Sequence, residues 1–416
     1  MKYHLIHITT GGEFKTPLVA SQLFDQAEVQ ATTNGENTPA TVSAWTIEPM
    51  RLLWDKQARE SLNRLRRRCP SISIKLVRGV SRLAGFPSGL FMILSRMLKG
   101  SAPAIYHCRG ESALQRVIFL KKWFPKDRFV LDVRGHWPSE LLYLSGITDV
   151  DHLDGNAKEL YEREEEKLRS SIKMANAITT VSDNLRELLI SKYGAGSNTT
   201  VVPCCVKSLS DRSQRNKIRT ELGYAVTDKV IVYSGTTASY QHLPDLTLPF
   251  MKRLTELSEN VKILLLTPDS GKMAELVQAA GISEKSYIIR SLPQEQVGVY
   301  LSAADAGVLI RRPTLVNKVA QPVKIAEYLA AGLRMIIEAE SVGISPELIE
   351  NQVVYCIHSI MHSNKSVLDQ DALAVLSFME KEQVLVATQE FVKSNFVWEK
   401  AIQKHRKTYS SILNLL

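Results

Sequence analysis

Strand-like runs alternate with helix-like patterns along both halves of the chain. Residues 104–108, 129–133 and 230–233 are short, mostly apolar runs rich in β-branched and aromatic residues, and a helical pattern follows each of them. Helices placed between successive strands act as crossovers, which join parallel strands and cover the faces of a sheet. We therefore predict an α/β fold built from parallel sheets, with functional loops at the carboxyl ends of the strands.

The length of the chain indicates more than one domain. With 416 residues, 44% of them hydrophobic, it exceeds what one core ordinarily holds. The polar segment 208–228 is the best candidate for a linker. We predict an N-terminal domain over residues 1–207 and a C-terminal domain over 208–395. A final helix, 396–416, is expected to pack back toward the N-terminal domain.

Several classes of protein are not expected. The sequence has no run of 18 or more apolar residues, so no transmembrane helix is expected. The start MKYHLIHITT lacks the apolar core of a signal peptide. The five cysteines show no CxxC spacing and the nine histidines form no ligand cluster, which favours a reduced, cytoplasmic compartment without a zinc site. P-loop, GxSxG and HExxH motifs are absent. The triplet Asp149-Val150-Asp151 lies among polar residues rather than after a strand, so we expect no metal there.

Residues 317–337, NKVAQPVKIAEYLAAGLRMII, read as a loop, a short helix, a tight turn and a buried strand. Pro322 suits the start of the helix, and Gly332 suits the left-handed residue that ends it. Lys324 falls in the first turn, where the helix dipole disfavours a cation unless an anion binds there. Glu327 shares its face. The spacing permits a nucleotide site, with Lys324 on phosphate and Glu327 on ribose, or an ordinary surface Lys–Glu pair.

The string PVKIAEYLAAG resembles the donor-site helix of retaining glycosyltransferases of the GT-B fold, family four in the usual sequence classification. The resemblance implies two Rossmann-like domains facing each other across a cleft, the domain 1–207 binding the acceptor and the domain 208–395 binding the nucleotide sugar. It also implies a helix start facing the donor diphosphate, and Glu327 on the ribose. The similar subgroup reads S-P-x-K-x-x-E-Y-L-A-x-G; here Gln321 replaces the serine, and Val319 stands where many members have an earlier glutamate. The implied donor-site residues are Ser234, Gly235, Thr236, Asn317, Gln321, Pro322, Lys324 and Glu327, with Lys324 and Glu327 as the catalytic pair.

The loop after residues 230–233, Ser-Gly-Thr-Thr, also resembles the family. Many members carry an arginine and a lysine soon after it, to bind the diphosphate. In this chain Tyr240, Gln241 and His242 occupy that region, so the resemblance leaves the diphosphate without those two cations.

Two strands of the first half both end in Arg-Gly, at Arg109 and Arg134. The carboxyl ends of parallel strands share one rim of a sheet, so we expect these arginines close together. The alternative is two loop arginines paired with Glu111 and Glu140. The segments HCRGESAL and LDVRGHWPSEL resemble the acceptor-side loops of the family, and the Gly-Gly pair after the first strand is either a substrate loop or an ordinary turn. The predicted acceptor or donor-sugar side comprises Gly11, Gly12, Arg109, Arg134, His136 and Glu140.

Positive charge is concentrated in one stretch. Between Arg51 and Gly100 there are twelve Lys/Arg against two Asp/Glu, a net of +10, while the whole chain carries +9. A basic, amphipathic composition is typical of segments at a membrane surface. The alternative is a solvated helix face, and no nucleic-acid motif is visible. We predict an anionic membrane surface as a partner through Arg51–Gly100, and no nucleic acid.

The predicted function is transfer of a sugar, with retention, from a nucleotide diphosphate sugar to a saccharide acceptor. We expect a lipid-linked acceptor at the inner face of the cell membrane, in surface polysaccharide assembly, and no cofactor or metal. Two alternatives stay open. A GT-B sugar-nucleotide epimerase would use the same nucleotide site without a membrane patch, and a catalytically silent GT-B protein would only bind glycan or lipid.

Overall fold

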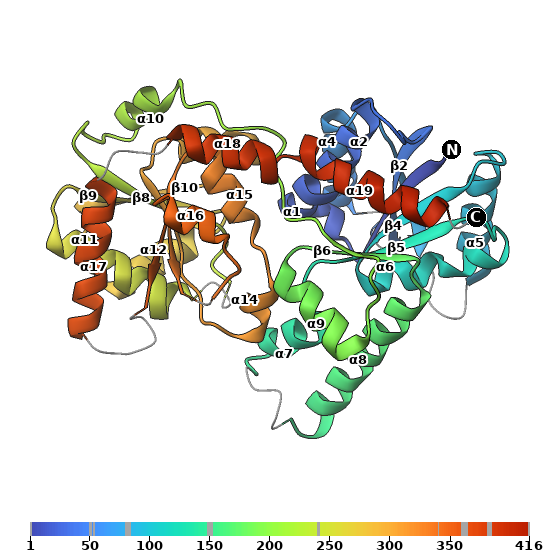
Figure 1. The fold of residues 1–416 in the computed structure, drawn as a ribbon. Helices are drawn as coiled ribbons and strands as arrows, with labels where there is room; N and C mark the ends of the chain where they lie inside the picture. Colours follow the sequence, from blue (N-terminus) through green and yellow to red (C-terminus); the bar gives the residue numbers. More distant parts are fainter. Residues whose placement is uncertain are drawn as a thin grey trace. The chain divides into compact units, whose positions relative to one another are not determined.

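The computed structural model describes residues 2–49, 52, 55–79, 85–147, 153–238, 242–339, 341–358, 365–380 and 385–414. The chain divides into two compact units. Unit 1 comprises Met1–Glu140, Asp149–Lys207 and Phe396–Leu416, and unit 2 comprises Leu141–Thr148 and Ser208–Asn395. Each unit contains one parallel sheet with helices on both faces (Figure 1), so the α/β prediction is confirmed.

The sheet of unit 1 has seven strands in the order β3-β2-β1-β4-β5-β6-β7, all paired in parallel. Going outward, the chain runs from β1 through β2 to β3, and it then returns to β4 and continues to β7. The strands are β1 (His4–Thr10), β2 (Thr41–Pro49), β3 (Ser73–Gly79), β4 (Ala104–Arg109), β5 (Arg128–Val133), β6 (Ala177–Thr180) and β7 (Thr199–Val201).

This reversal of direction decides which face each helix covers. Crossovers between parallel strands are right-handed, so helices on the outward path cover one face and helices on the return path cover the other. The first face carries η1 (Glu13–Lys15), α1 (Pro17–Val19), η2 (Ala20–Phe24), α2 (Asp25–Thr32), α4 (Lys56–Arg68) and α19 (Trp398–Leu413), whose apolar residues share one core. The second face carries α5 (Gly85–Met97), α6 (Gly110–Val117), η3 (Ile118–Lys122), α8 (Gly155–Met174) and α9 (Asp183–Tyr193); α7 (Trp137–Leu144) follows β5.

Two segments of unit 1 have more regular structure than their local sequence pattern indicates. The polar residues 28–44 contain the end of α2, which runs to Thr32, a connection, and the start of β2 at Thr41. The basic residues 76–98 contain the end of strand β3 and then helix α5. Several polar residues of α2 are buried, in part against α19. Because α19 lies at the other end of the chain, the local sequence pattern around α2 could not predict this contact.

Helix α19 completes unit 1. Trp398 is fully buried, and its indole N–H donates to the Ser21 carbonyl at 3.0 Å. The side-chain amide nitrogen of the buried Gln26 lies 3.0 Å from Nε2 of the buried His405, and Arg406 donates to the Thr33 carbonyl. The last segment of the chain is thus part of the core of the first unit.

The sheet of unit 2 has six parallel strands in the order β10-β9-β8-β11-β12-β13. The strands are β8 (Lys229–Ser234), β9 (Val261–Leu266), β10 (Tyr287–Arg290), β11 (Ala306–Leu309), β12 (Arg334–Glu338) and β13 (Val354–Ile357). One face is covered by η5 (Leu243–Thr247), α11 (Leu248–Leu257), α12 (Ser270–Ala280) and α17 (Lys365–Glu380), which enclose its largest core cluster. The other face carries α13 (Gln294–Leu301), α14 (Leu315–Val319), α15 (Val323–Ala330), α16 (Pro346–Glu350) and α18 (Leu385–Asn395); η6 (Glu284–Ser286) precedes β10.

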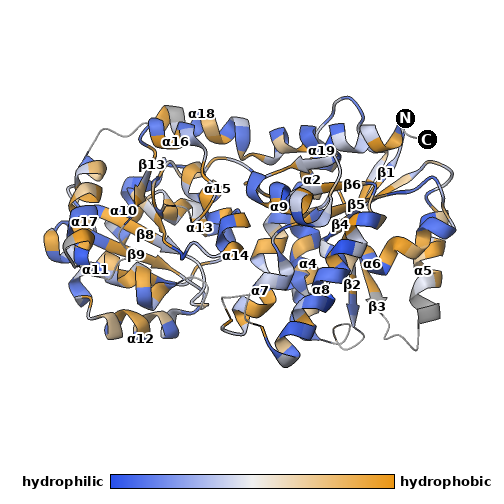
Figure 2. Ribbon diagram, turned by 60° about the horizontal axis from the view of Figure 1, so that its bottom comes forward, coloured by the Kyte–Doolittle hydropathy of each residue, from blue (hydrophilic) through white to orange (hydrophobic). Residues whose placement is uncertain are grey.

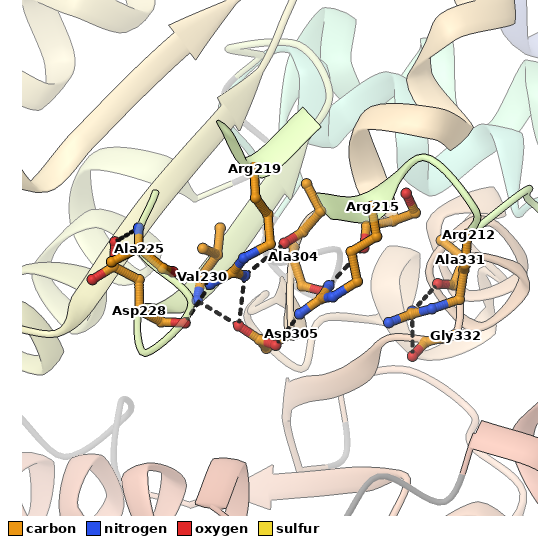
Figure 3. Close-up of polar contacts among 12 residues, drawn as sticks. Arg212, Arg215, Arg219, Ala225, Asp228, Val230, Ala304, Asp305, Ala331 and Gly332 are labelled. Carbon is orange, nitrogen blue, oxygen red and sulfur yellow. Dashed lines mark hydrogen bonds and ion pairs between the residues drawn. The ribbon is translucent and has the colours of Figure 1, made fainter. Parts of the chain in front are cut away.

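An arginine–aspartate cluster attaches the first helix of unit 2, α10 (Arg215–Glu221), to the sheet (Figure 3). Asp305 lies just before β11 and accepts from Arg215 at 2.6 Å and from Arg219 at 3.5 Å. The same carboxylate accepts the Val230 amide at 2.8 Å, at the start of β8. Arg219 also donates to the Asp228 carbonyl at 2.7 Å. A single half-buried carboxylate therefore holds together the helix and two strands.

Candidate functional site

The site is built on helix α15 of unit 2. Pro322 precedes it in an extended conformation (φ −61°, ψ 133°), which starts the helix at Val323. Gly332 follows it with φ +69°, a left-handed conformation that favours glycine. Arg212 donates to the carbonyls of Ala331 and Gly332, so a cation neutralises the helix C-terminus. At the other end of α15 the first backbone amides have no acceptor within the helix, and Lys324 lies in this first turn.

Lys324 is buried, with only 7% of its surface exposed. Its ammonium lies over the ring of Tyr233, 4.3 Å from the centroid, a cation–π contact. A Cβ added to Gly235 would lie 2.5 Å from Lys324 Nζ, so the absence of a side chain at Gly235 is what lets the ammonium approach the loop after β8. The interpretation of Lys324 as half of a surface ion pair is therefore wrong.

A second cation, Arg311, lies close to Lys324. It lies two residues after the end of β11 and is 7% exposed. Burial, and then the positive charge of Arg311, hold the pKa of Lys324 well below its usual range, and Glu327 offsets this only in part. Two buried like charges are costly unless an anion binds between them. Sequence reasoning missed Arg311, although an arginine at the carboxyl end of a central strand is a usable signal.

Glu327 lies one turn after Lys324 on α15. Gln294, which begins α13, donates to Glu327 Oε1 at 3.3 Å. Burial raises the pKa of the Glu327 carboxyl, while Lys324 and Gln294 act in the opposite direction. The residue is half-buried, so a ligand at the helix can still reach the carboxylate. Lys324 and Glu327 thus present a cation and a hydrogen-bond acceptor on one side of the helix.

The loop after β8 is fixed beside α15 by two tyrosines. The Ser234 amide donates to the Tyr328 hydroxyl at 2.9 Å, and the Tyr233 hydroxyl donates to the Thr236 carbonyl at 2.7 Å. The ring of Tyr328 packs where Gly307 of β11 has no side chain. The backbone of Ser234, Gly235 and Thr236 is therefore placed by side chains from α15 and β8 themselves.

The remaining predicted donor-site residues are in the segment before α15. Asn317 is buried and donates to the Arg312 carbonyl at 2.9 Å, and Gln321 is also buried. Tyr240 and Gln241 lie outside the described residues. His242 is buried and lies 3.3 Å from Asp245, which also accepts from Arg312 at 2.9 Å.

In unit 1, Arg109 and Arg134 lie at the carboxyl ends of the neighbouring strands β4 and β5. Burial lowers the pKa of Arg109, and the positive charge of the nearby Arg134 lowers it further. The ion pairs that the two arginines make are with other carboxylates than the Glu111 and Glu140 of the alternative, although the charge of Arg109 also acts to lower the pKa of Glu140. Arg109 Nε lies 3.4 Å from Glu13, and Arg134 lies 3.8 Å from Asp132. Arg134 also donates to Gln22 Oε1 at 3.2 Å and to Cys204 Sγ at 3.0 Å.

Gly11 and Gly12 both have left-handed φ values, +74° and +78°, in the turn after β1. The Gly12 amide donates to Glu48 Oε2 at 2.6 Å. Glu48 is fully buried at the end of β2, and burial raises the pKa of its carboxyl to about 7. Sequence reasoning missed this carboxylate, because β2 was not recognised as a strand.

Glu140 and His136 follow β5. Burial, with the nearby charge of Glu111, raises the pKa of Glu140 to about 7. His136 is fully buried: its ring nitrogens lie 2.7 Å from the Ser139 hydroxyl and 2.5 Å from the Tyr193 hydroxyl. Burial lowers the pKa of His136 to about 4, so the ring is neutral near pH 7.

Among the described residues, no group of three or more His, Cys, Asp or Glu side chains is arranged to hold a metal ion. The Asp149-Val150-Asp151 triplet lies outside the described residues. None of the helices in the described part of the chain combines the length and hydropathy that crossing a bilayer requires.

The comparisons with known proteins bear on the fold. The sequence matches no protein-family model and no curated protein. Three solved structures are similar over nearly the whole of both chains: a glycosyltransferase from Rickettsia africae (14% identity, TM-score 0.65, 99% of each chain); sucrose-phosphate synthase from Thermosynechococcus elongatus (12%, 0.68, 100% of each); and HepE from Anabaena in complex with UDP and glucose (12%, 0.64, 98% of this chain and 99% of that one). The chain has the GT-B fold. At these identities the similarity establishes the fold, and function must be argued from the site.

Proposed function

We propose that the protein is a glycosyltransferase that uses a nucleotide diphosphate sugar as donor. The observation that carries the proposal is the burial of Lys324 beside Arg311, at the start of α15 and against the loop of Gly235. A site with two buried cations at the N-terminus of a helix suits a doubly charged diphosphate. The HepE structure, which holds UDP and glucose, has the same fold and supports this choice of ligand.

In the proposed reaction the bond between the sugar C1 and the diphosphate oxygen breaks as the acceptor oxygen bonds to C1. The acceptor hydroxyl proton passes to the departing diphosphate, so charge and atoms balance. The transition state is oxocarbenium-like, with negative charge growing on the leaving oxygen. Lys324, Arg311 and the amides of α15 stabilise that charge, which is why we propose a metal-independent enzyme. Glu327 accepts from the ribose hydroxyls, and the anomeric configuration is retained.

The finer assignments are proposals of the same kind. Ser234, Gly235, Thr236, Asn317, Gln321 and Pro322 would complete the donor site. In unit 1, Gly11, Gly12, Arg109, Arg134 and Glu140 would serve the acceptor or the donor sugar, and His136 would act by holding the loop after β5. The acceptor would be a lipid-linked saccharide at the inner face of the cell membrane, in surface polysaccharide assembly, with the Arg51–Gly100 stretch toward an anionic membrane surface.

Release of nucleotide diphosphate tests the proposal against both alternatives. The enzyme is incubated with UDP- and GDP-sugars, with and without a membrane lipid extract, and free UDP or GDP is measured. A glycosyltransferase gives slow release that the extract accelerates. An epimerase gives a new sugar nucleotide, visible by chromatography, without net release. A protein that binds a nucleotide but gives neither product is the silent binder, and the transferase proposal is then wrong.

A further inference from the structure

Helix α5 of unit 1 exposes apolar side chains on its solvent side. Among residues 89–97, whose side chains the structure describes, Met92, Ser95 and Arg96 are buried, each 5% exposed or less. The exposed ones follow the helical spacing i, i+1, i+4, i+7 and i+8, which places them along one stripe. They are Leu90, Phe91, Leu94, Met97 and, directly after the helix, Leu98, which is 87% exposed. Apolar residues on the buried side are expected of any helix; a stripe on the outer side needs a partner.

Segment η3 and the residue after it extend the stripe. Phe119 and Trp123 are both exposed, Trp123 to 61%. A Cβ on Gly89 of α5 would lie 3.7 Å from the ring of Phe119, so the two segments pack side by side. In Figure 2 the described part of α5 is largely coloured as hydrophobic, at the end of the unit near β3. We call this surface the α5–η3 face.

The exposed charges of the segment 85–126, which forms the α5–η3 face, have one sign. Arg116, Lys121, Lys122 and Lys126 are exposed, and Lys99 is half-buried. Between residues 85 and 126 the sequence has one acidic residue, Glu111, which is buried. Arg96 adds no surface charge, because its guanidinium is buried against Asp127 at 2.7 Å. An apolar stripe in a segment whose exposed charges are all positive matches a surface that is apolar inside and anionic outside.

We propose that the α5–η3 face docks onto an anionic phospholipid bilayer, with its apolar stripe inserted among the acyl chains and its lysines at the headgroups. The proposal deepens the proposed function, which needs a bilayer to present a lipid-linked acceptor. A second copy of the chain suits the face less well, because pairing two copies would bring the same lysines together. Each lysine near an anionic bilayer contributes about a fivefold gain in affinity at low salt, and the inserted side chains add a part that salt does not remove.

This assignment divides the basic stretch into two parts. Helix α4 holds the exposed Arg64, Arg66 and Arg67, but it covers the opposite face of the sheet from α5, since its apolar side packs with α2 and α19. Both helices adjoin the edge strand β3, yet of the two only α5 exposes apolar residues, and the exposed cations beside them come from η3 and the residues after it. The arginines of α4 are therefore a matched control: they have the same charge and exposure, and they lie on the other side of the sheet.

The test is flotation of the full-length protein with two kinds of vesicle. One kind is phosphatidylcholine alone, and the other contains about 30% of the anionic lipid phosphatidylglycerol. Wild type should float with the anionic vesicles and much less with the neutral ones. Lys121→Glu/Lys122→Glu/Lys126→Glu should lower the vesicle partition coefficient by about 100-fold or more. Leu94→Ser/Leu98→Ser should abolish the binding that survives 0.5 M salt. Arg64→Glu/Arg66→Glu/Arg67→Glu changes the net charge equally and should bind nearly as wild type.

Two further readouts make the result decisive. The fluorescence of Trp123 should shift to the blue on anionic vesicles, and Trp123→Phe should remove that shift although four other tryptophans remain. Failure of wild type to bind, or an equal loss in the α4 variant, overturns the proposal. So does a dimer that Leu94→Ser/Leu98→Ser dissociates, because it would identify a second copy as the occupant. Nucleotide binding is measured for each variant. A variant that binds nucleotide but not vesicles is folded, so the loss concerns the membrane proposal and not the proposed use of a nucleotide sugar.

Discussion

Replacing Lys324 with methionine should stabilise the unliganded protein while abolishing nucleotide binding. The side chains have similar lengths, so the change mainly removes the buried charge. It also removes the cation–π contact with Tyr233, which is worth about 0.5–2 kcal/mol. The charge beside Arg311 carries a desolvation cost of several kcal/mol. The balance favours the variant by about 1–2 kcal/mol, or roughly 2–8 °C in the melting temperature of a unit of this size.

The sign of the pH dependence follows from the lowered pKa of Lys324. The unfolded lysine binds a proton up to pH values near 10.4, whereas the folded one releases it at lower pH. The penalty is therefore full below the folded pKa and vanishes as pH rises toward the unfolded value. The advantage of Lys324→Met should accordingly be greatest at low pH and disappear toward pH 10. An anion bound to Lys324 raises its pKa again, so nucleotide binding should weaken as pH rises.

Calorimetric melting between pH 6 and pH 10, with and without UDP or GDP, measures these effects. Lys318→Met is the matched control, because Lys318 is an exposed lysine on the neighbouring helix α14. It should change the unfolding free energy by no more than about 0.5 kcal/mol and leave nucleotide binding intact. If Lys324→Met instead melts at lower temperature and still binds nucleotide as wild type, Lys324 is a packing residue and the reasoning is wrong.

Four further outcomes are expected. Glu327→Ala should weaken nucleotide affinity tenfold to a hundredfold in calorimetry, by loss of charge-assisted bonds of about 1.5–3 kcal/mol; unchanged affinity in the folded variant removes the ribose role. Turnover should persist in excess EDTA, whereas a loss that Mn²⁺ or Mg²⁺ restores contradicts metal independence. Gly235→Ala should impair nucleotide binding, because its Cβ would lie 2.5 Å from Lys324 Nζ, and wild-type affinity refutes that crowding. Asp305→Ala should destabilise unit 2 by about 2–3 kcal/mol in urea unfolding, since it leaves Arg215 and its neighbours without their acceptor; a negligible change contradicts the role of the cluster.

Local patterns predicted the elements that depend on local physics. The helix around Lys324, the glycine that ends it and the apolar strand after it all have their signals within a few residues, and the structure has them as α15, Gly332 and β12. The alternation of strands and helices was enough for the α/β class. The segment before β2 carries no clear local signal because α2 is polar, and its polar side chains are buried by contacts with distant parts of the chain, among them Arg68 of α4 and His405 of α19.

Burial was the property that the sequence could not supply. Lys324 and Glu327 read equally well as a surface pair, and only packing against Tyr233 and the Gly235 loop distinguishes the two cases. Arg311 is separated from Lys324 by thirteen positions and reaches it through the order of strands in the sheet. The same holds for the basic stretch, whose arginines on α4 and apolar residues on α5 lie on opposite faces of one sheet.

The most direct test of the central claim is isothermal titration of the wild-type protein with UDP and GDP, each compared with its monophosphate and its nucleoside. The account predicts that at least one diphosphate binds, at least tenfold more tightly than the monophosphate, and that Lys324→Met abolishes the difference. The heat measured in buffers of different ionisation enthalpy should show proton uptake on binding, and the uptake should be absent from the variant. If neither diphosphate binds, or if Lys324→Met binds it as tightly as wild type, the buried cations beside α15 do not form a diphosphate site.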